Sequence, residues 1–555
     1  MSSHVQMRLS RTLTPITIGL LLKGEHRGAD EGRRSWARRF QAAFDRGFER
    51  MRVGYVALLT TLMKRRFIVP IAVISILGLG VAMFLMVGRD FFPIIDGGQI
   101  QLHVRAPAGT RIETTERIFQ AVENKIRDGV ILVALKDGHA PTANYIRQLR
   151  EVLPAAFPED VFYFQPADIV TQILNFGLPA QIDVRTVGYD RMTNLHVAEE
   201  LRRRMAAIPG VVDAHLQQEV YAPAFYATID RARAQQLGLN ANTVATNVNI
   251  SLSSSEQVSP NFWTDPKSGI PYYLAVQTPE PRVASLNDLA NTPVSSAVTA
   301  AGALIPGLLS NVATFKRDTV PTNSNQTNIQ PVYEVYASIE GRDLGGVAAD
   351  INKIVTELQS QLSPGNTIQV VGQIQSMKDS FHNLGIGLLF AAVFVYLLMV
   401  INYQNFGDPF VVILALPITF CGILTMLFIT GTTLNVPSLM GAIMAVGVAS
   451  ANSILLVTFA REQQLAGKPA SEAAIDAGRT RIRPVLMTAA AMIVGMIPMA
   501  IGGAGDEQNA VLARAVIGGL LFATPTTLLV VPYLFAKLRK CNDGKPAQGV
   551  FERQV

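Results

Sequence analysis

Charge is scarce in this chain, and it is unevenly distributed. Asp, Glu, Lys and Arg together make up 16% of the 555 residues, and long stretches after Ser380 contain none of them. The uncharged stretches are residues 380–407, 410–460, 484–505 and 515–536. Because a helix that crosses a bilayer needs about 20 apolar residues, each stretch is long enough to cross at least once. The pattern predicts a membrane protein rather than a soluble enzyme.

Residues that build redox, metal and nucleotide sites are also few. The two cysteines cannot frame a disulfide, because Cys421 lies inside an uncharged stretch and Cys541 follows the last one. The histidines show no paired ligand spacing, and the methionines of residues 88–379 are scattered, whereas soft metals need clusters. The chain has no Gly-x-x-x-x-Gly-Lys-Ser/Thr sequence of an ATPase. We expect no enzyme activity, cofactor or metal site.

The hydrophobic pattern also defines a topology. One uncharged span, residues 67–87, precedes a long polar segment, and residues 410–460 must bend once, which we expect at residues 431–435. This predicts one transmembrane helix followed, after residue 379, by a bundle of five over residues 380–540. With six crossings, three basic clusters fall on one side, and that side is the cytoplasm by the positive-inside rule. The clusters are residues 64–66, 461–483 and 537–540. They account for the net charge of +6 without a nucleic-acid partner.

The two ends of the chain differ from the rest. Residues 1–24 include an apolar stretch too short to span a bilayer, so we expect either an interfacial segment or the remnant of a preceding transmembrane helix. Residues 25–66 are basic and carry large apolar residues at helical spacing, which predicts an amphipathic helix on the cytoplasmic membrane surface, with arginines directed toward lipid phosphates. These apolar residues are Trp36, Phe40, Phe44, Phe48, Met51 and Tyr55. Residues 541–555 form a cytoplasmic tail.

Residues 88–379 alternate between strand and helix patterns. We predict strands that include Gln99–Arg105, Val161–Gln165, Ile182–Val187 and Val211–Leu216, and helices that include residues 111–127. Repeated strand–helix–strand units predict an α+β outer domain of small split β-α-β (ferredoxin-like) sandwiches. Residues 251–323 have weaker periodicity and are expected to form irregular β and loop structure.

Several short motifs, in order along the chain, carry a resemblance to a known family. They are Leu13-Thr14-Pro15, Phe91-Phe92-Pro93, Asp96-Gly97-Gly98-Gln99, Pro107-Ala108-Gly109-Thr110, Asn402-Tyr403-Gln404-Asn405-Phe406, Asn452-Ser453-Ile454-Leu455, residues 481–488 and Gln508-Asn509-Ala510. Together they resemble the carboxy-terminal half of resistance-nodulation-division (RND) efflux permeases of the multidrug/acriflavin-resistance type. The resemblance implies a proton-driven antiporter in the inner membrane that exports amphiphilic organic compounds. Because methionine clusters are lacking, we rank metal export below export of organic compounds. It also implies that residues 88–379 form a periplasmic porter domain with a docking insertion near residues 225–323.

Such permeases contain two repeated halves, and the resemblance covers one of them. It therefore implies a separate amino-terminal half, or full-length permease protomers, as partners in a trimer. It also implies a periplasmic adaptor, an outer-membrane channel, membrane lipid as surroundings and the proton as coupling ion. The chain is shorter than the family pattern near Asp128-Gly129, where another strand and loop are expected.

The coupling residues can be carried over one by one. A charge in the bilayer core is costly, so ionisable residues there mark proton paths. The family's aspartates lie on a helix that this chain lacks, and Ala451 stands where the family has a lysine. The resemblance then implies a proton relay of Asn452, Thr488 and Arg481, with Asn452 facing Thr488 across the bundle. Alternatively, Ser450, Asn452 and Ser453 are residues that let helices pack closely.

Two further alternatives stay open. Phe162 and Phe164 are candidates to line an apolar substrate cleft, although aromatic residues that alternate along a strand more often belong to a core. A protein-export accessory subunit has the same plan of one plus five helices, and a truncated, inactive product would have this same sequence. The RND permease half is the interpretation that the motifs favour.

Overall fold

The computed structural model describes residues 36–65, 67–105, 129–136, 138–158, 160–167, 169–175, 177–279, 282–283, 285–295, 306–503 and 505–540. The chain divides into two compact units. The first, a helical unit, comprises Met1–Val87, Leu384–Ile501 and Asn509–Val555, and the second, an α/β unit, comprises Gly88–Asn383 and Gly502–Gln508. The predicted segments 1–24 and 541–555, the motif at 107–110, the helix at 111–127 and Asp128 lie outside the described residues.

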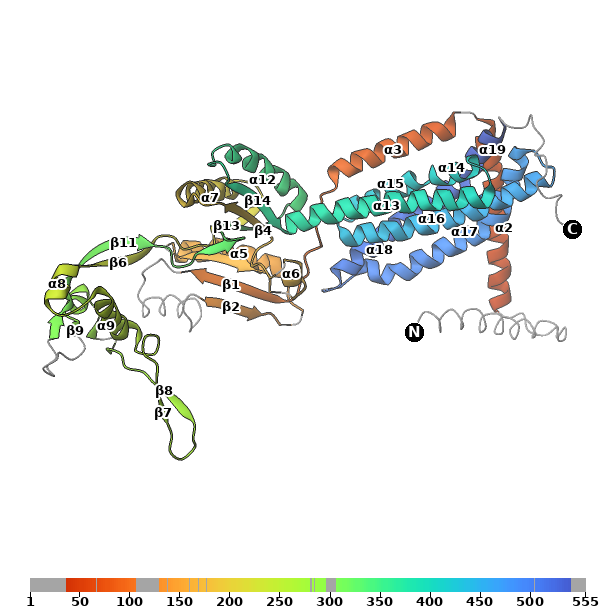
Figure 1. Ribbon diagram of the computed structural model, residues 1–555. Helices are drawn as coiled ribbons and strands as arrows, with labels where there is room; N and C mark the ends of the chain where they lie inside the picture. The colour runs from red at the N-terminus through yellow and green to blue at the C-terminus, as the bar shows by residue number, and fades with distance from the viewer. Residues whose placement is uncertain are drawn as a thin grey trace. The chain divides into compact units, whose positions relative to one another are not determined.

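The described residues contain six helical segments long and apolar enough to cross a membrane (Figure 1). The first two are α3 (Ile68–Met86) and α13 (Gln373–Tyr403). The third consists of α14 (Gly407–Ile413) together with α15 (Leu416–Ile429), and the fourth is α16 (Val436–Leu465). The last two are α17 (Ala470–Ile501) and a run of α18 (Glu507–Pro525), η2 (Thr526–Val530) and α19 (Val531–Lys540). The break between α15 and α16 falls at the predicted bend, where Gly431 has a φ of +62° that suits glycine.

Helix α16 begins at a capping box. The Asn435 side chain accepts a hydrogen bond from the Ser438 amide at 3.0 Å, and the Ser438 hydroxyl accepts one from the Asn435 amide at 2.8 Å. Both residues are buried, so the cap satisfies backbone groups that would otherwise lack partners in an apolar setting.

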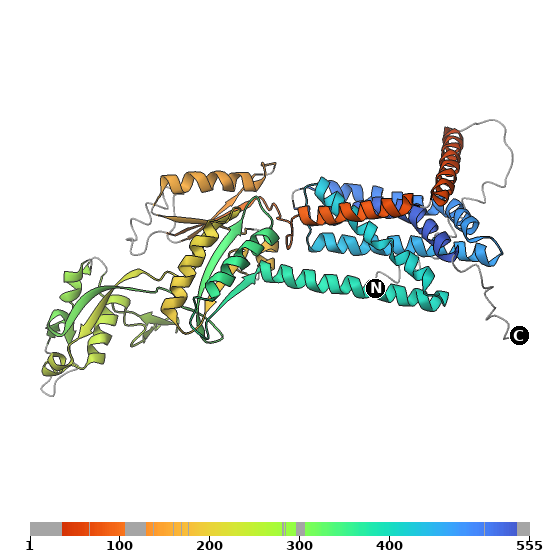
Figure 2. The ribbon, with the colours of Figure 1, turned by 90° about the horizontal axis from the view of Figure 1, so that it is seen from above.

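Helix α2 (Trp36–Lys64) runs across the ends of the membrane-length helices rather than along them (Figures 1 and 2). Tyr55 is buried against the bundle, and its hydroxyl donates to the Leu528 carbonyl at 2.7 Å. Gly478 of α17 makes room for this side chain, because a Cβ there would overlap the Tyr55 ring and hydroxyl. The side chains of Trp36, Phe40 and Phe44 lie outside the described residues.

The α/β unit contains a three-stranded antiparallel sheet in the order β2-β1-β3. Its strands are β1 (Gln99–Arg105), β2 (Gly129–Ala134) and β3 (Val161–Gln165), and α5 (Thr142–Ala156) connects β2 to β3. Buried apolar residues on one face of this sheet pack with Leu153 of α5. The strand patterns of the sequence predicted β1 and β3 at their observed bounds; β1 buries alternate side chains, whereas β3 buries Tyr163 and Phe164 on opposite faces.

A second antiparallel sheet has the order β12-β13-β4-β14. One edge of β13 pairs with β12 near its start and with β5 near its end, and the other edge pairs with β4. Helix α7 (Arg191–Ala206) connects β4 (Ile182–Val187) to β5 (Val211–Leu216), and α12 (Leu344–Gln359) connects β13 (Gln330–Ile339) to β14 (Thr367–Gly372). The short strand β12 is Asn325–Thr327, and α6 (Ile169–Leu174) precedes the sheet. Helical apolar segments and mixed α/β content are thus both present.

Residues 222–320 form an insertion between β5 and β12 that is more regular than expected. Strand β6 (Ala222–Ile229) pairs with β11 (Ala313–Val320) along its full length. Beyond this ribbon, α8 (Arg231–Gln236), α9 (Ala241–Ser253), α10 (Leu286–Ala290), β9 (Pro293–Ser295), β10 (Pro306–Leu308) and α11 (Leu309–Val312) surround a small apolar core. The apolar residues of the insertion are buried against one another in this core, which the weak periodicity of the sequence did not predict.

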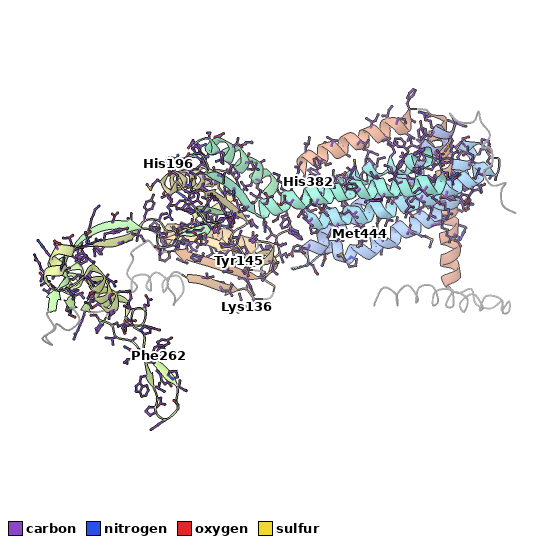
Figure 3. All side chains as sticks on the ribbon, viewed as in Figure 1. Lys136, Tyr145, His196, Phe262, His382 and Met444 are labelled. Carbon is purple, nitrogen blue, oxygen red and sulfur yellow. The ribbon has the colours of Figure 1, made fainter. Side chains whose placement is uncertain are left out.

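A hairpin of β7 (Asn261–Thr264) and β8 (Pro271–Leu274) projects from this insertion. All eight residues of its strands are exposed, and Figure 3 shows Phe262 on its flank. Its aromatic side chains pair across the strands: Phe262 lies 4.5 Å from Tyr273 and Trp263 lies 6.1 Å from Tyr272, measured between ring centroids. A cluster of exposed aromatic residues on a projecting hairpin is typical of a contact surface.

Candidate functional site

Small residues on α15, α16 and α18 position the polar side chains of the helical unit. A Cβ at Gly519 would lie 2.6 Å from the Ala445 Cβ, and a Cβ at Gly441 would lie 2.6 Å from the Leu512 carbonyl oxygen. These glycines therefore let α16 and α18 approach closely, as small residues do between membrane helices. The close approach continues toward η2 and brings its hydroxyls to α16.

Ser453 is the buried polar centre of this contact. It is 1% exposed, and its hydroxyl lies 3.1 Å from the Thr527 hydroxyl on η2. The five-residue π-helical segment η2 widens the backbone, and π-helical segments often occur at functional sites. Ser450 is also buried, and its hydroxyl donates to the Gly447 carbonyl of its own helix at 2.9 Å. Both serines occupy the positions expected of helix-packing residues.

The three residues of the predicted relay lie on two helices that pack together. Asn452 is half-buried on α16, whereas Arg481 is half-buried and Thr488 exposed on α17. The Thr488 hydroxyl donates to the Val485 carbonyl within its own helix at 3.0 Å. Among the described residues, no hydrogen bond joins Asn452 to Thr488.

Arg481 connects α17 to α16 through an aromatic ring. Its guanidinium carbon lies 5.4 Å from the centre of the Phe459 ring, a cation–π distance. Its Nε is buried and has no hydrogen-bond partner among the described residues. A buried guanidinium N–H without an acceptor costs free energy. An acceptor from outside the described residues would remove that cost by accepting a hydrogen bond from it.

A buried ion pair joins Asp408 of α14 to Arg539 of α19. The carboxylate of Asp408, which is 2% exposed, accepts two hydrogen bonds from Arg539, at 2.6 and 3.2 Å. Close by in the chain, the Tyr403 hydroxyl lies 2.5 Å from the Thr458 hydroxyl, and the Tyr403 carbonyl accepts from Arg461 at 2.6 Å. This pair was not predicted from the sequence, although a lone acid in an apolar stretch indicates that a cation must pair with it.

The two aromatic candidates in the α/β unit belong to its core. Phe164 is 5% exposed and lies in the cluster with Ile100, Leu102, Val104, Ile131 and Leu153, and Phe162 packs against that cluster. The Arg150 guanidinium also lies 5.1 Å above the Phe164 ring. These contacts favour the core interpretation of both side chains.

The opposite face of β3 forms a joint between the two sheets. Tyr163 stacks between His103 of β1, at 4.4 Å, and His215 of β5, at 3.9 Å between ring centroids. The His215 Nδ1 lies 2.7 Å from the Asp213 carbonyl, and its Nε2 is buried without a partner among the described residues. Burial of the His215 ring lowers its pKa to about 4, so the ring is neutral at physiological pH.

Ion pairs hold the same joint together. Asp213 of β5 accepts hydrogen bonds from Arg150 of α5 at 2.6 Å and from the Phe164 amide at 3.1 Å. Glu340, just after β13, accepts from Arg147 at 2.7 Å and also pairs with Arg150. These pairs could not be predicted from the sequence, because each joins helix α5 to a residue in or next to the second sheet that is far away along the chain.

Comparison with known proteins assigns the family. A family model described as AcrB/AcrD/AcrF matches residues 2–143 and 129–539. The chain belongs to the AcrB/AcrD/AcrF family. This result confirms the resemblance to RND permeases that the motifs suggested.

Relatives of this AcrB/AcrD/AcrF family member include metal- and drug-resistance proteins. It is 26% identical to the cobalt-zinc-cadmium resistance protein CzcA of Cupriavidus metallidurans, over 95% of this chain and 51% of that protein. It is 25% identical to the multidrug resistance protein MdtC of Proteus mirabilis, over 96% of this chain and 52% of that protein. The chain thus spans about half the length of these relatives. Both are named as resistance proteins, and the family match confirms the expectation that this family member is not an enzyme.

A solved structure supports the fold of this AcrB/AcrD/AcrF family member. The crystal structure of a heavy metal efflux pump superimposes with a TM-score of 0.75 at 22% identity. The match covers 89% of this chain and 52% of the pump. At this identity the likeness concerns the fold alone.

Proposed function

We propose that this chain is the carboxy-terminal half of a proton-driven efflux permease. The observation that carries the proposal is the family match along nearly the whole chain, combined with a length about half that of the matched relatives. The partner is a separate amino-terminal half or full-length permease protomers, in a trimer. The protein-export alternative is set aside, because the family match assigns the chain to efflux proteins.

The proposed permease half lies in the inner membrane. In this proposal its six apolar helical segments cross the bilayer, and the basic clusters support a cytoplasmic position for residues 461–483. Residues 88–379 then lie in the periplasm as the porter domain. The order β14-β4-β13-β5, with helices between β4 and β5 and between β13 and β14, supports a ferredoxin-like porter unit.

The insertion near residues 225–323 is the proposed docking region. Exposed aromatic side chains on the β7–β8 hairpin support a contact with the periplasmic adaptor or the outer-membrane channel. Aromatic residues are enriched at the centres of protein interfaces, where they bury a large area at a small entropic cost.

Proton coupling is proposed to use Asn452, Thr488 and Arg481 together with acids of the other half. Arg481 supports this proposal with its buried, unpartnered Nε, which is suited to a carboxylate. Thr488 supports it with a side chain exposed at the surface of this chain, where a second half can cover it. The relay is thus completed between halves rather than by a direct Asn452–Thr488 hydrogen bond.

Two substrate classes have support. CzcA, named for cobalt, zinc and cadmium resistance, favours divalent metal cations. MdtC, named for multidrug resistance, favours amphiphilic organic compounds. The expectation from the sequence that metal export ranks below export of organic compounds does not agree with the similarity to CzcA, so we propose metal cations as the first class to test.

Complementation in cells that lack their own efflux pumps tests the proposal. The chain expressed alone should not raise tolerance to zinc, cobalt, dyes or detergents. Co-expression with an amino-terminal half that carries the family's aspartates should raise tolerance to one class, and dissipation of the proton gradient should abolish the gain. Proton-dependent tolerance from the chain alone would contradict the half-permease proposal.

Variants in the co-expressed pair test the relay. Asn452→Leu or Thr488→Val should abolish transport without loss of inserted protein. Ser450→Ala is the matched control, because its hydroxyl bonds within its own helix. Normal transport by both relay variants would leave only the packing role.

A further inference from the structure

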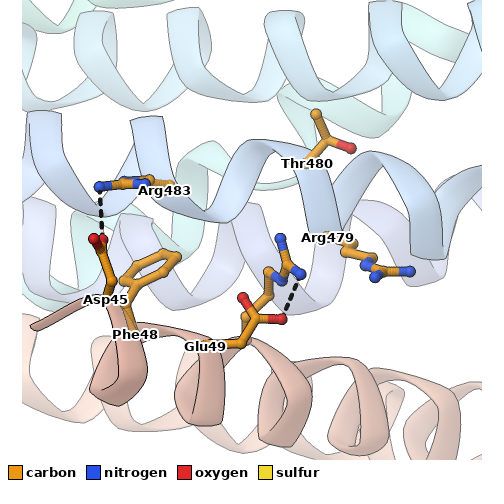
Figure 4. Close-up of a pocket in the computed structure, with 7 residues that line it drawn as sticks. Asp45, Phe48, Glu49, Arg479, Thr480 and Arg483 are labelled. Atoms are coloured by element: carbon orange, nitrogen blue, oxygen red, sulfur yellow. Dashed lines mark hydrogen bonds and ion pairs between the residues drawn. The ribbon is translucent and has the colours of Figure 1, made fainter. Parts of the chain in front are cut away.

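A polar pocket lies between α2 and α17, with a volume of about 480 Å³ (Figure 4). Residues on one face of α2, spaced three or four positions apart, form one wall of the pocket, and residues about one turn apart on α17 form the other wall. The lining residues are Asp45, Phe48, Glu49, Arg52, Arg479, Thr480 and Arg483.

The pocket carries an excess of positive charge. Three guanidinium groups face two carboxylates, which leaves a formal charge of +1. Arg483 contacts Asp45 at 3.4 Å, and Arg52 pairs with Glu49 on its own helix. Arg479 is exposed and has no hydrogen bond or ion pair with any residue that the structure describes. One guanidinium is therefore available to an external anion.

The walls of the pocket are held in a fixed spacing. Tyr55, one turn beyond Arg52, donates to the Leu528 carbonyl, and it fits against Gly478, which precedes Arg479. The Arg483 guanidinium also lies 5.5 Å above the Phe48 ring. The site is thus built by packing between α2 and α17 and does not depend on the ion pairs alone.

The pocket opens at the level where α17 changes from charged to apolar. Arg483 is the last charged residue before the uncharged stretch 484–505, and Met487, one turn further, is 60% exposed. An acyl chain can therefore lie along α17 while its headgroup occupies the pocket. A free phosphate ion would gain nothing from this apolar surface.

We propose that this pocket binds the headgroup phosphate of an anionic phospholipid from the cytoplasmic leaflet. Arg479 and Arg483 donate to the phosphate oxygens, since guanidinium groups bind phosphate through paired, charge-assisted hydrogen bonds. The Thr480 hydroxyl supplies a further donor, and Asp45 competes for Arg483. The bound lipid fixes α2 to the membrane surface beside α17.

This inference rests on the membrane placement proposed above. The test uses the full chain, purified and placed in phosphatidylcholine nanodiscs, with short-chain phosphatidylglycerol as the titrated ligand. Arg479→Gln combined with Arg483→Gln should weaken binding by about tenfold to thirtyfold, because each arginine near an anionic surface contributes roughly fivefold. The control, Lys468→Gln combined with Lys537→Gln, removes the same charge outside the pocket and should leave binding unchanged.

A second variant separates binding from folding. Asp45→Asn removes the carboxylate that competes for Arg483, so it should tighten phosphatidylglycerol binding by about fivefold. A damaged fold cannot produce such a gain. Equal losses in the pocket and control variants, or no gain from Asp45→Asn, would overturn the proposal.

Inorganic phosphate distinguishes a lipid from a free anion. It should fail to displace phosphatidylglycerol at millimolar concentration, and displacement at equal concentrations would assign the pocket to free phosphate instead. The titration needs no transport, so its failure is distinguishable from failure of the efflux proposal.

Discussion

Asp408 is the only charged residue between Asp379 and Arg461, and its carboxylate is enclosed against Arg539. Removing both charges from water is costly, and the bidentate geometry offsets that cost. The pair fixes the start of α14 to α19, which are far apart in sequence. The pair therefore contributes mainly by holding these two helices in position. Removal of either partner would leave the other as an uncompensated buried charge.

Arg539→Gln should destabilise the helical unit by about 3 kcal/mol, because it leaves the Asp408 carboxylate buried and unpaired. Thermal unfolding in detergent and the yield of inserted protein measure the loss. Asp408→Asn combined with Arg539→Gln should recover most of it, since no lone charge remains. The nearby Lys537→Gln is the control and should behave as the wild type. A double variant as unstable as Arg539→Gln alone would contradict this account.

His215 is the residue that makes the joint of the two sheets sensitive to acid. Its pKa falls from 6.5 to about 4 because burial disfavours the charged ring. The unfolded chain binds a proton on this ring as the pH falls below about 6.5, whereas the folded chain does not until about pH 4. The stability that the neutral ring provides is therefore complete above this window and is lost as the pH falls through it.

Hydrogen exchange of peptides from β3 and β5, corrected for the intrinsic pH effect, measures this loss. Between about pH 7.5 and about pH 5, the opening free energy should fall by about 2 kcal/mol more in the wild type than in His215→Phe. The phenyl ring retains the stack on Tyr163 but cannot bind a proton. His196→Phe, at an exposed position of α7, is the control and should keep the acid response. An unchanged response in His215→Phe would assign the sensitivity to another group.

At the scale of elements, glycine decides how close α15 comes to α18. A Cβ at Gly422 would lie 2.5 Å from the Gly518 carbonyl oxygen, and a Cβ at Gly518 would lie 2.7 Å from the Gly422 carbonyl oxygen. Neither backbone can move without separating the helices. Membrane helices gain most of their association from such close packing, because lipid offers no hydrophobic driving force between them.

Gly422→Val should therefore cost about 2 kcal/mol or more through overpacking against backbone. Gly495→Val, on α17, provides a matched control, because nothing described lies within 4 Å of the position its Cβ would take. Thermal melting and proteolysis of the purified chain compare the two variants. Equal stability of both would show that the α15–α18 contact does not limit folding.

The π-helical segment η2 joins two further elements. The Leu528 carbonyl within it accepts a hydrogen bond from Tyr55 of α2, and Thr527 faces Ser453 of α16. A widened turn exposes groups that a regular α-helix would use internally. The π-helical segment η2 therefore connects α2 to the interior of the bundle.

At the scale of the whole molecule, the proposed topology places residues 88–379 outside and residues 461–483 in the cytoplasm. Ser268 and Ser471 are both exposed, so neither position is hidden by the fold. A membrane-impermeant thiol reagent applied to intact cells should label Ser268→Cys and not Ser471→Cys. The background is a variant without the native cysteines. Labelling of both positions, or of Ser471→Cys alone, would reverse or refute the orientation.

The sequence by itself determined the family, the apolar segments and much of the local structure. Uncharged length predicted the helices, and the strand patterns of the sequence predicted β3, β4 and β5 at their observed bounds. The order of short motifs predicted the AcrB/AcrD/AcrF family. These properties depend on neighbouring residues, whose periodicity and hydropathy can be read along the chain.

Tertiary structure decided which side chains meet across long separations. Asp408 and Arg539 lie 131 positions apart, Arg150 and Asp213 lie 63 apart, and Tyr55 reaches a carbonyl 473 positions away. No periodicity encodes such partners, because each contact depends on how closely whole helices and sheets approach. The same reason explains Tyr55 in the bundle, Phe164 in a core, and the pocket between α2 and α17. Each is fixed by packing between elements, which the local pattern of residues does not contain.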